Sequence, residues 1–199
     1  MTRRLALAAL LSVIVTVSPA AQEASQAAAD RARVKIDAIN ALGDEHRDRQ
    51  AAAARTTLTE VEVNAYLRVH GPDVLPKGIA EPEIRLGDDS RIRARAIIDL
   101  DEVRRSRPRA WRDPLAYVTG SVEVVATGRV TANDGIARAQ LESATVAGLS
   151  VPKSVVEELL RFHTVTTERP EGFDLDEPFV LPANIQRVVV RRGHATIVQ

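Results

Sequence analysis

The feature that most constrains the fold is a regular alternation of apolar and mainly charged residues between positions 91 and 101. Its apolar members are Ile92, Ala94, Ala96, Ile98 and Leu100. Successive side chains of a β-strand point to opposite faces of a sheet. The pattern therefore predicts a strand with one face in a core and the other in solvent.

Two hairpins are predicted on either side of tight turns. Residues 122–131 and 136–147 flank the turn 132–135, whose Asn, Asp and Gly accept the positive φ angles of tight hairpins. A second hairpin is predicted across residues 185–198, around Arg192-Gly193. Strands joined by such short turns must run antiparallel, because parallel pairing needs a long crossover.

A short helix is predicted to begin near Glu60. Thr59 and Glu62 have the S/T-x-x-E spacing of a capping box, and Gly71-Pro72 is expected to end the helix. Its apolar face consists of Val63, Tyr66, Leu67 and His70, spaced at i, i+3, i+4 and i+7. This face must be buried against another element.

A second capping box, formed by Ser154 and Glu157, predicts another helix that ends near His163. The apolar stripe of this helix comprises Val155, Val156, Leu159, Leu160 and Phe162. We expect the stripe to lie on the sheet. Residues 164–178 contain two prolines and several acidic residues, and they are predicted to form an exposed loop.

The first 21 residues are interpreted as a signal peptide. Arg3 and Arg4 precede an almost wholly apolar stretch at residues 5–17, and small residues follow at 18–21. The apolar stretch is shorter than the roughly 20 residues that cross a bilayer. We therefore predict a cleaved peptide, with an uncleaved anchor as the alternative.

Residues 22–56 are predicted to form an Ala/Arg-rich helical leader, and residues 57–199 a single domain. The leader helix should end near Gly43, and its large apolar residues are Val34, Ile36, Ile39 and Leu42. This apolar face is thin. The leader is therefore either a loosely attached spacer or a helix that packs on the domain or on a second copy of the chain.

Together these elements predict an α+β fold. We expect a curved antiparallel meander of five or six strands, two packed short helices and a longer N-terminal helix.

Composition excludes several classes of function. The chain has no cysteine, which excludes disulfides, thiolate metal sites, a cysteine nucleophile and a lipid-modified cysteine. Basic and acidic residues number 27 each, so the formal net charge is zero and provides no long-range attraction to nucleic acid. Partners must therefore be recognised locally.

The sequence contains no recognisable catalytic or metal-binding motif. Its four histidines form no H-x-x-x-H pair, and its serines lack the G-x-S-x-G pattern. Asp99 and Asp101 would share one face of the predicted strand, and they are the residues on which an enzyme hypothesis would rest. A solvated charge ladder with the neighbouring arginines is the simpler interpretation, so we predict no enzyme activity, no cofactor and no metal.

Residues 104–112 form the one concentrated charge feature, in which five arginines surround Trp111. Guanidinium groups match phosphate oxygens, and tryptophan favours membrane interfaces. The segment therefore predicts contact with an anionic group. The alternative is a loop whose cations face the acidic residues at 168–177.

Residues 58–67, LTEVEVNAYL, resemble the short helix that opens a group of exported bacterial proteins, with the pattern T/S-E-x-E-L-N-x-Y/L-L. Meandering strands, residues 146–160 and the PFVLP segment at 178–182 follow in the same order as in that group. The pattern is similar to bacterial envelope proteins related to the tubular lipid-binding superfamily. The resemblance implies a curved sheet that wraps a helix and leaves an apolar groove, and it carries over no catalytic residue.

The leading hypothesis is a non-enzymatic envelope protein, periplasmic or extracellular, that binds or shields a lipid-like apolar ligand in a groove between sheet and helices. The predicted lining consists of Val63, Tyr66, Leu67, Val156, Leu159 and Leu160, with Arg105, Arg107, Arg109 and Trp111 toward an anionic head group. The alternative is a structural or protein-interaction module with a packed core and no ligand. The expected partners are a lipid or fatty-acyl ligand, a peripheral membrane contact and a second copy through the N-terminal helix, but not nucleic acid.

Overall fold

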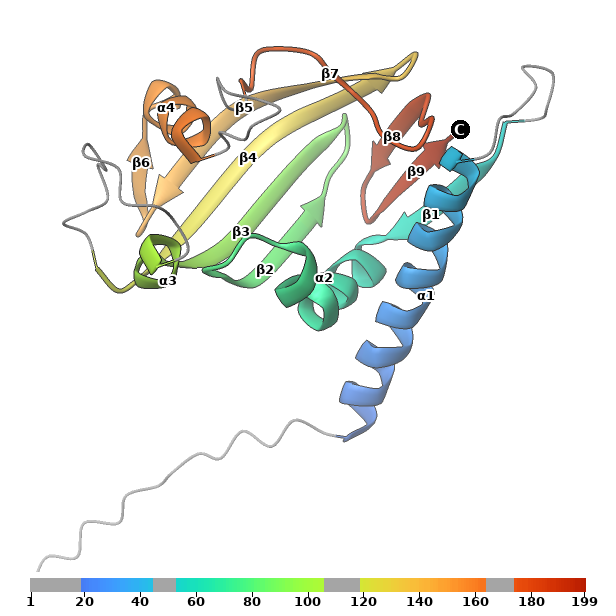
Figure 1. Ribbon diagram of the computed structural model, residues 1–199, viewed down its shortest axis with the longest axis horizontal. Helices are drawn as coiled ribbons and strands as arrows, with labels where there is room; N and C mark the ends of the chain where they lie inside the picture. The colour runs from blue at the N-terminus through green and yellow to red at the C-terminus, as the bar shows by residue number, and fades with distance from the viewer. Residues whose placement is uncertain (1–18, 45–52, 106–118, 164–173) are drawn as a thin grey trace, which may run out of the picture.

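The computed structural model describes residues 19–44, 53–105, 119–163 and 174–199. These residues form a curled antiparallel half-barrel sheet with helices along its margins (Figure 1). The predicted α+β class is therefore confirmed. Among the described residues, no helix combines the length and apolar character needed to cross a membrane.

The helices are α1 (Pro19–Asp44), α2 (Glu60–Val74), α3 (Leu100–Arg105) and α4 (Lys153–His163). The strands are β1 (Arg55–Thr59), β2 (Ile79–Leu86), β3 (Arg91–Asp99), β4 (Ser121–Asn133), β5 (Ile136–Val146), β6 (Leu149–Val151), β7 (Phe179–Val180), β8 (Arg187–Arg191) and β9 (His194–Val198).

Within the described ranges, the main path of the sheet has the order β1-β9-β8-β4-β3-β2. Strand β5 pairs with β4, while β6 and β7 pair with β5. Both predicted hairpins are confirmed, since β4 pairs with β5 and β8 with β9, each pair antiparallel. Asp134 and Gly135, with φ angles of 53° and 78°, form the two-residue turn that matches the twist of paired strands.

The predicted strand at 91–101 ends at Asp99, and Leu100 begins α3. The reason is a local cap: Oδ1 of Asp99 accepts hydrogen bonds from the backbone N–H groups of Asp101 (2.9 Å) and Glu102 (3.0 Å). Asp101 therefore lies on the short helix α3, and the idea that Asp99 and Asp101 share a strand face is wrong.

Helix α2 begins at Glu60 as predicted, but it continues past Gly71-Pro72 and ends at Val74. A proline ring clashes with the backbone N–H and the Cβ atom of the residue before it, and Gly71 has no Cβ, so one of these clashes is removed. The last turn of α2 therefore accommodates Pro72.

Helix α4 begins at Lys153, so Ser154 lies inside the helix and is not its cap. The first turn is closed by the carbonyl of Pro152, which accepts from the N–H of Val155 at 3.1 Å. Glu157 instead lies 3.2 Å from Nζ of Lys153 as an i, i+4 ion pair.

Helix α1 packs on α2 through small side chains. Ala28 and Ala29 of α1 and Ala65 of α2 form a buried cluster, against which Val69 lies. Of the predicted apolar residues of α1, Val34 is 69% exposed, whereas Ile39 is buried and Ile36 and Leu42 are half-buried. The buried side of α1 therefore combines its alanines with Ile39 and leaves Val34 in solvent. Of the arrangements considered for the leader helix, the structure has it packed on the domain, while residues 1–18 of the predicted signal peptide lie outside the described ranges.

Strand register gives the sheet an apolar face and a charged face, because directly paired residues share a face. On β3 and β4, Ile92, Ala94, Ala96 and Ile98 pair with Gly128, Ala126, Val124 and Val122. These residues belong to the apolar face, which β5 extends with Ala139, Leu141, Ala144 and Val146. The intervening residues, among them Arg91, Arg93, Arg95 and Arg129, belong to the charged face.

A β-bulge in β5 keeps the apolar residues of this strand on the apolar face of the sheet. The register shifts where Thr127 pairs with Ser143 but Gly128 pairs with Leu141, so Glu142 is the extra residue. Glu142 lies on the charged face, where its carboxylate contacts Arg91 (3.0 Å) and Arg129 (3.1 Å). Without the bulge, the alternation that runs from Leu141 would place Ser143 on the apolar face and Ala144 on the charged face.

The contact between α1 and α2 predicts the effect of a larger side chain at Ala29, which is fully buried. We expect Ala29→Leu to lower the free energy of unfolding by about 1–3 kcal/mol, because overpacking forces the helices apart. Urea denaturation measures the change. Ala27→Leu, at an exposed position of the same helix, is the matched control and should leave the stability nearly unchanged. Equal effects of the two variants would contradict the packing of α1 on α2.

Candidate functional site

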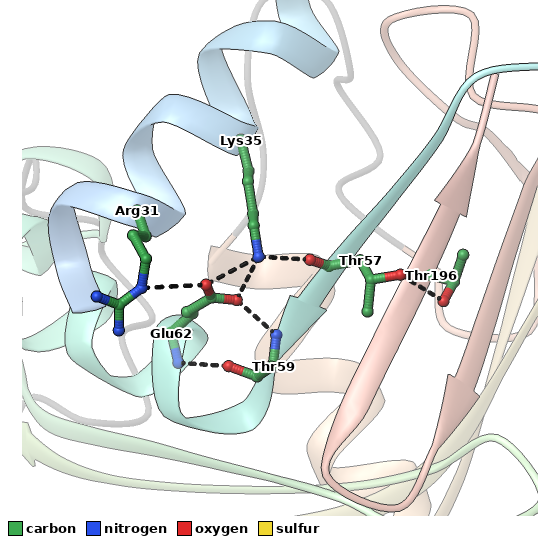
Figure 2. A network of polar contacts seen from close by, with 6 residues as sticks. All are labelled: Arg31, Lys35, Thr57, Thr59, Glu62 and Thr196. Carbon is green, nitrogen blue, oxygen red and sulfur yellow. Dashed lines mark hydrogen bonds and ion pairs between the residues drawn. The ribbon is translucent and has the colours of Figure 1, made fainter. Parts of the chain in front are cut away.

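Glu62 on α2 is the buried centre of a polar network that joins three elements (Figure 2). Nζ of Lys35, from α1, donates to both carboxylate oxygens of Glu62 and to the carbonyl of Thr57 in β1, each at 2.8 Å. Nε of Arg31, also from α1, lies 3.7 Å from Oε1 of Glu62. The network therefore fixes α1 against both α2 and β1.

The predicted capping box is confirmed at the start of α2. The N–H of Thr59 donates to Oε2 of Glu62 (2.9 Å), and the N–H of Glu62 donates to Oγ1 of Thr59 (3.2 Å). Burial would by itself raise the pKa of Glu62. The hydrogen bonds from Lys35 and Thr59 outweigh burial, so the pKa of Glu62 lies below its ordinary value and the carboxylate is charged in the folded protein.

Two other polar residues of α2 close the edge of β2. The side-chain amide of Asn64 accepts from the N–H of Ile84 (2.7 Å) and donates to the carbonyl of Ile84 (2.8 Å), as a neighbouring strand would. Oε2 of Glu60 accepts from the N–H of Leu86 at 2.7 Å. An edge strand with open N–H and C=O groups invites pairing with other chains. Helix α2 therefore protects this edge through its side chains.

The apolar face of the sheet is a second feature of interest because it is only partly covered. Residues in its middle, such as Ala94, Ala96, Val124 and Ala126, are half-buried. The most deeply buried side chains of the described part are alanine methyl groups, those of Ala28, Ala29, Ala32 and Ala137, with exposed fractions of 1% or less. Among the described residues, no large side chain is fully buried.

The predicted lining residues are divided between two separate helices. Val63, Tyr66 and Leu67 are half-buried on α2, which packs against α1, β1 and β2. Val156 and Leu160 are half-buried on α4, which packs on β5, while the side chain of Leu159 lies outside the described part. Strands β3 and β4 separate β2 from β5 (Figure 1), so a ligand that touched both helices would lie across these strands.

The predicted anionic contact is described at only one of its residues. Arg105 is exposed at the end of α3 and lies 2.8 Å from a carboxylate oxygen of Glu102. This carboxylate raises the pKa of Arg105 above its ordinary value. Arg107, Arg109 and Trp111 lie outside the described residues.

Two described residues of the acidic segment 168–177, the expected partners of this basic segment, instead have partners on α4. Asp174 lies 2.5 Å from a guanidinium nitrogen of Arg161, and Asp176 lies 2.6 Å from Nζ of Lys153. The N–H of Asp176 and the guanidinium of Arg161 lower the pKa of Asp174. The described part of the acidic segment is therefore anchored to its own neighbouring helix.

Asp101, one of the two residues of the enzyme hypothesis, has structural partners. Its Oδ2 accepts from the N–H of Gly120 at 3.0 Å, and its Oδ1 pairs with Arg104. The N–H of Gly120 and the guanidinium of Arg104 lower the pKa of Asp101. Within the described ranges, no three His, Asp or Glu side chains gather closely enough to hold a metal ion.

Two neighbouring cavities lie where α2 meets the charged face of β2. One, of about 500 Å³, is lined by Ala24, Ser25, Glu60, Val61, Asn64, Ala65, Arg68, Glu83 and Arg85. The other, of about 410 Å³, is lined by Glu60, Arg85, Leu86, Gly87, Arg91, Arg93, Arg192 and Gly193. Sequence reasoning did not single out these arginines, because the cavity joins β2, β3 and the distant β8–β9 turn.

Comparisons with known proteins give no family for the chain. No protein-family model matches it, and no curated protein matches it. A crystal structure of lipopolysaccharide binding protein is weakly similar, with a TM-score of 0.22 and 12% sequence identity. The similarity covers 73% of this chain and 40% of that chain. The resemblance to tubular lipid-binding proteins therefore stays a prediction.

The Glu62 network predicts a pH-dependent stability. We expect Glu62→Gln to lower the free energy of unfolding near neutral pH by about 1–3 kcal/mol, because Lys35 and the N–H of Thr59 lose a charged acceptor. The folded-state pKa of Glu62 is depressed, so its contribution is complete above about 4.5 and is lost as the pH falls through the folded-state pKa.

Urea denaturation of both proteins from neutral pH to about pH 3 measures this dependence. The stability gap should close at the acid end, and a gap that stayed constant would contradict the role of the charge. Glu158→Gln is the control, since Glu158 is exposed on α4 and should show no gap at any pH.

The two hydrogen bonds between the Asn64 side chain and the backbone of Ile84, here called the clamp on β2, give a separate prediction. We expect Asn64→Ala to destabilise the fold by about 1–3 kcal/mol, because the N–H and C=O groups of Ile84 lose their partner. Amide hydrogen exchange should also become faster at Ile84. Asn40→Ala, at an exposed position of α1, is the matched control and should change neither quantity. An Asn64→Ala protein as stable as this control would show that the clamp is dispensable.

Proposed function

We propose that this chain is an exported, non-enzymatic protein of the bacterial envelope that holds or shields a lipid-like apolar ligand on the apolar face of its sheet. The observation that carries the proposal is the incomplete burial of that face. Strands β3, β4 and β5 present a continuous series of Ala, Val, Ile and Leu side chains there. Helices α2 and α4 pack at β2 and β5, on either side of these strands.

Burial of apolar surface is the main favourable term in folding, so an apolar face that is incompletely buried is costly unless something covers it. The members at the middle of the face are small, since Ala94, Ala96, Ala126 and Ala144 lie on adjacent strands in register. Small side chains leave room for a flexible chain to lie along the strands. Predominantly apolar lining of this kind is typical of sites for lipid-like ligands.

Export is proposed from the charged and apolar N-terminal sequence, and the lack of enzyme activity from the absence of a catalytic motif in the sequence. In the described residues, the polar groups with lowered pKa values also have structural partners. Glu62 joins α1 to α2, Asp101 holds Gly120, and Asp174 holds α4 through Arg161. These roles account for the charges without a reaction.

Native mass spectrometry of the mature protein from its own host, followed by organic extraction, tests the proposal. We expect a bound mass that extraction identifies as a phospholipid or fatty acid. A folded protein that shows only the mass of its own chain would contradict the proposal and favour an interaction module.

A substitution on the apolar face tests whether such a ligand binds there. We expect Ala126→Phe to lower the amount of co-purified lipid several-fold, because the larger ring occupies the space above Ala94 and Ala144, the direct partners of Ala126. Quantitative lipid extraction measures the change, with circular dichroism to confirm folding. Thr131→Phe, at an exposed position of the same strand, is the control and should retain the wild-type amount.

A further inference from the structure

The cavity of about 410 Å³ on the charged face has an unusual lining, because four arginines converge on it from three parts of the chain. Arg85 comes from β2, Arg91 and Arg93 from β3, and Arg192 from the β8–β9 turn. Glu60, at the start of α2, is the only acidic residue among those that line the cavity.

The cavity is built on a fixed backbone. The N–H of Gly193 donates to the carbonyl of Leu86 (2.9 Å), and the N–H of Glu60 donates to the carbonyl of Gly193 (2.7 Å). The N–H of Gly87 donates to the carbonyl of Arg91 at 2.8 Å. The β2–β3 turn, the β8–β9 turn and the start of α2 are thus tied together, so the four arginines are carried by one rigid frame.

Three of the arginines have carboxylate partners around the rim. Arg91 contacts Glu142 (3.0 Å), Arg192 contacts Asp88 (2.6 Å), and Arg85 contacts Glu83 (2.7 Å) and Glu60 (3.5 Å). Arg91 and Arg192 each use Nε and Nη2 in these contacts, which orients the guanidinium and leaves Nη1 for another acceptor. Exposed ion pairs of this kind contribute little to stability.

Arg93 differs from the other three, because it has no hydrogen-bond or ion-pair partner among the residues that the structure describes. Its neighbours along β3, Arg91 and Arg95, are each paired with a glutamate, Glu142 and Glu123 respectively. Among the described residues of this face, no carboxylate forms an ion pair with Arg93. The cavity therefore carries an uncompensated cation beside three oriented guanidinium groups.

We propose that this cavity binds a phosphate group, carried either by a soluble anion or by the head group of an anionic lipid. Guanidinium forks match the geometry of phosphate oxygens, and several arginines can share one doubly charged group. The oxygen atoms of the phosphate accept from Arg93 and from the Nη1 groups of Arg91 and Arg192. This site lies on the charged face and is independent of the proposed apolar ligand.

The test titrates the full-length mature protein with sodium pyrophosphate by isothermal calorimetry, and measures its flotation with phosphatidylcholine vesicles that contain or lack phosphatidylglycerol. We expect binding to at least one anionic probe and none to pure phosphatidylcholine. Binding of pyrophosphate supports a soluble phosphate, and flotation with phosphatidylglycerol vesicles alone supports a lipid head group. Absence of binding to both anionic probes would overturn the proposal.

Arg93→Ala locates the binding in the cavity. We expect this variant to weaken the affinity about tenfold, because a charged hydrogen-bond donor is lost without disturbing an existing ion pair. Arg187→Ala removes the same charge from an exposed position of β8 outside the cavity, and it should bind as the wild type does. Equal weakening by both variants, or none by Arg93→Ala, would overturn the site. Organic extraction of the Arg93→Ala protein should return the wild-type amount of any apolar ligand, so the two proposals fail separately.

Discussion

The buried carboxylate of Glu62 is the interaction on which the arrangement of the N-terminal half depends. This carboxylate accepts hydrogen bonds from the N–H of Thr59, at the start of α2, and from Nζ of Lys35 in α1. The same Nζ also donates to the carbonyl of Thr57 in β1. A charge in such a place is costly unless it is fully paired, and here the partners come from two other segments, α1 and the end of β1. The alanine contact between α1 and α2 is close and has little specificity of its own, so this network sets the register of the two helices.

The opening segment of α2 has an architectural role at nearly every polar position. Thr59 and Glu62 cap the helix, Glu60 and Asn64 close the edge of β2, and the resulting frame holds the turn at Gly193. The polar pattern for which this segment resembles the opening helix of a group of exported bacterial proteins therefore has a structural role in this chain. These polar residues hold a helix along a sheet edge.

Much of the fold follows from local patterns. The alternation around Ala94 predicts a half-buried strand, Asp134-Gly135 predicts a hairpin, and Thr59 with Glu62 predicts the start of α2. Each of these signals is contained within a few residues, and the structure confirms all three. The strand-to-helix change at Asp99 was missed because an aspartate at the end of a strand can equally be a surface charge or a helix cap, and only the backbone conformation decides.

The candidate sites were harder to predict because they depend on contacts between distant segments. Lys35 and Glu62 are 27 positions apart, and Arg192 meets the β2–β3 turn from the far end of the chain. No spacing rule connects such residues. The apolar face could be predicted strand by strand, but its incomplete burial depends on where α2 and α4 lie, which the helix patterns alone do not determine.

The pairing of β1 with β9 has a consequence for the way in which the protein is made. Strand β1 is bonded along its whole length to residues 194–198, and the backbone of Ala54 exchanges hydrogen bonds with that of Gln199. A ribosome therefore releases β1 long before its partner strand exists, and contacts of such long sequence separation form late in folding. The edge of the sheet formed by β1 and β9 therefore cannot form until residues 194–198 have left the ribosome.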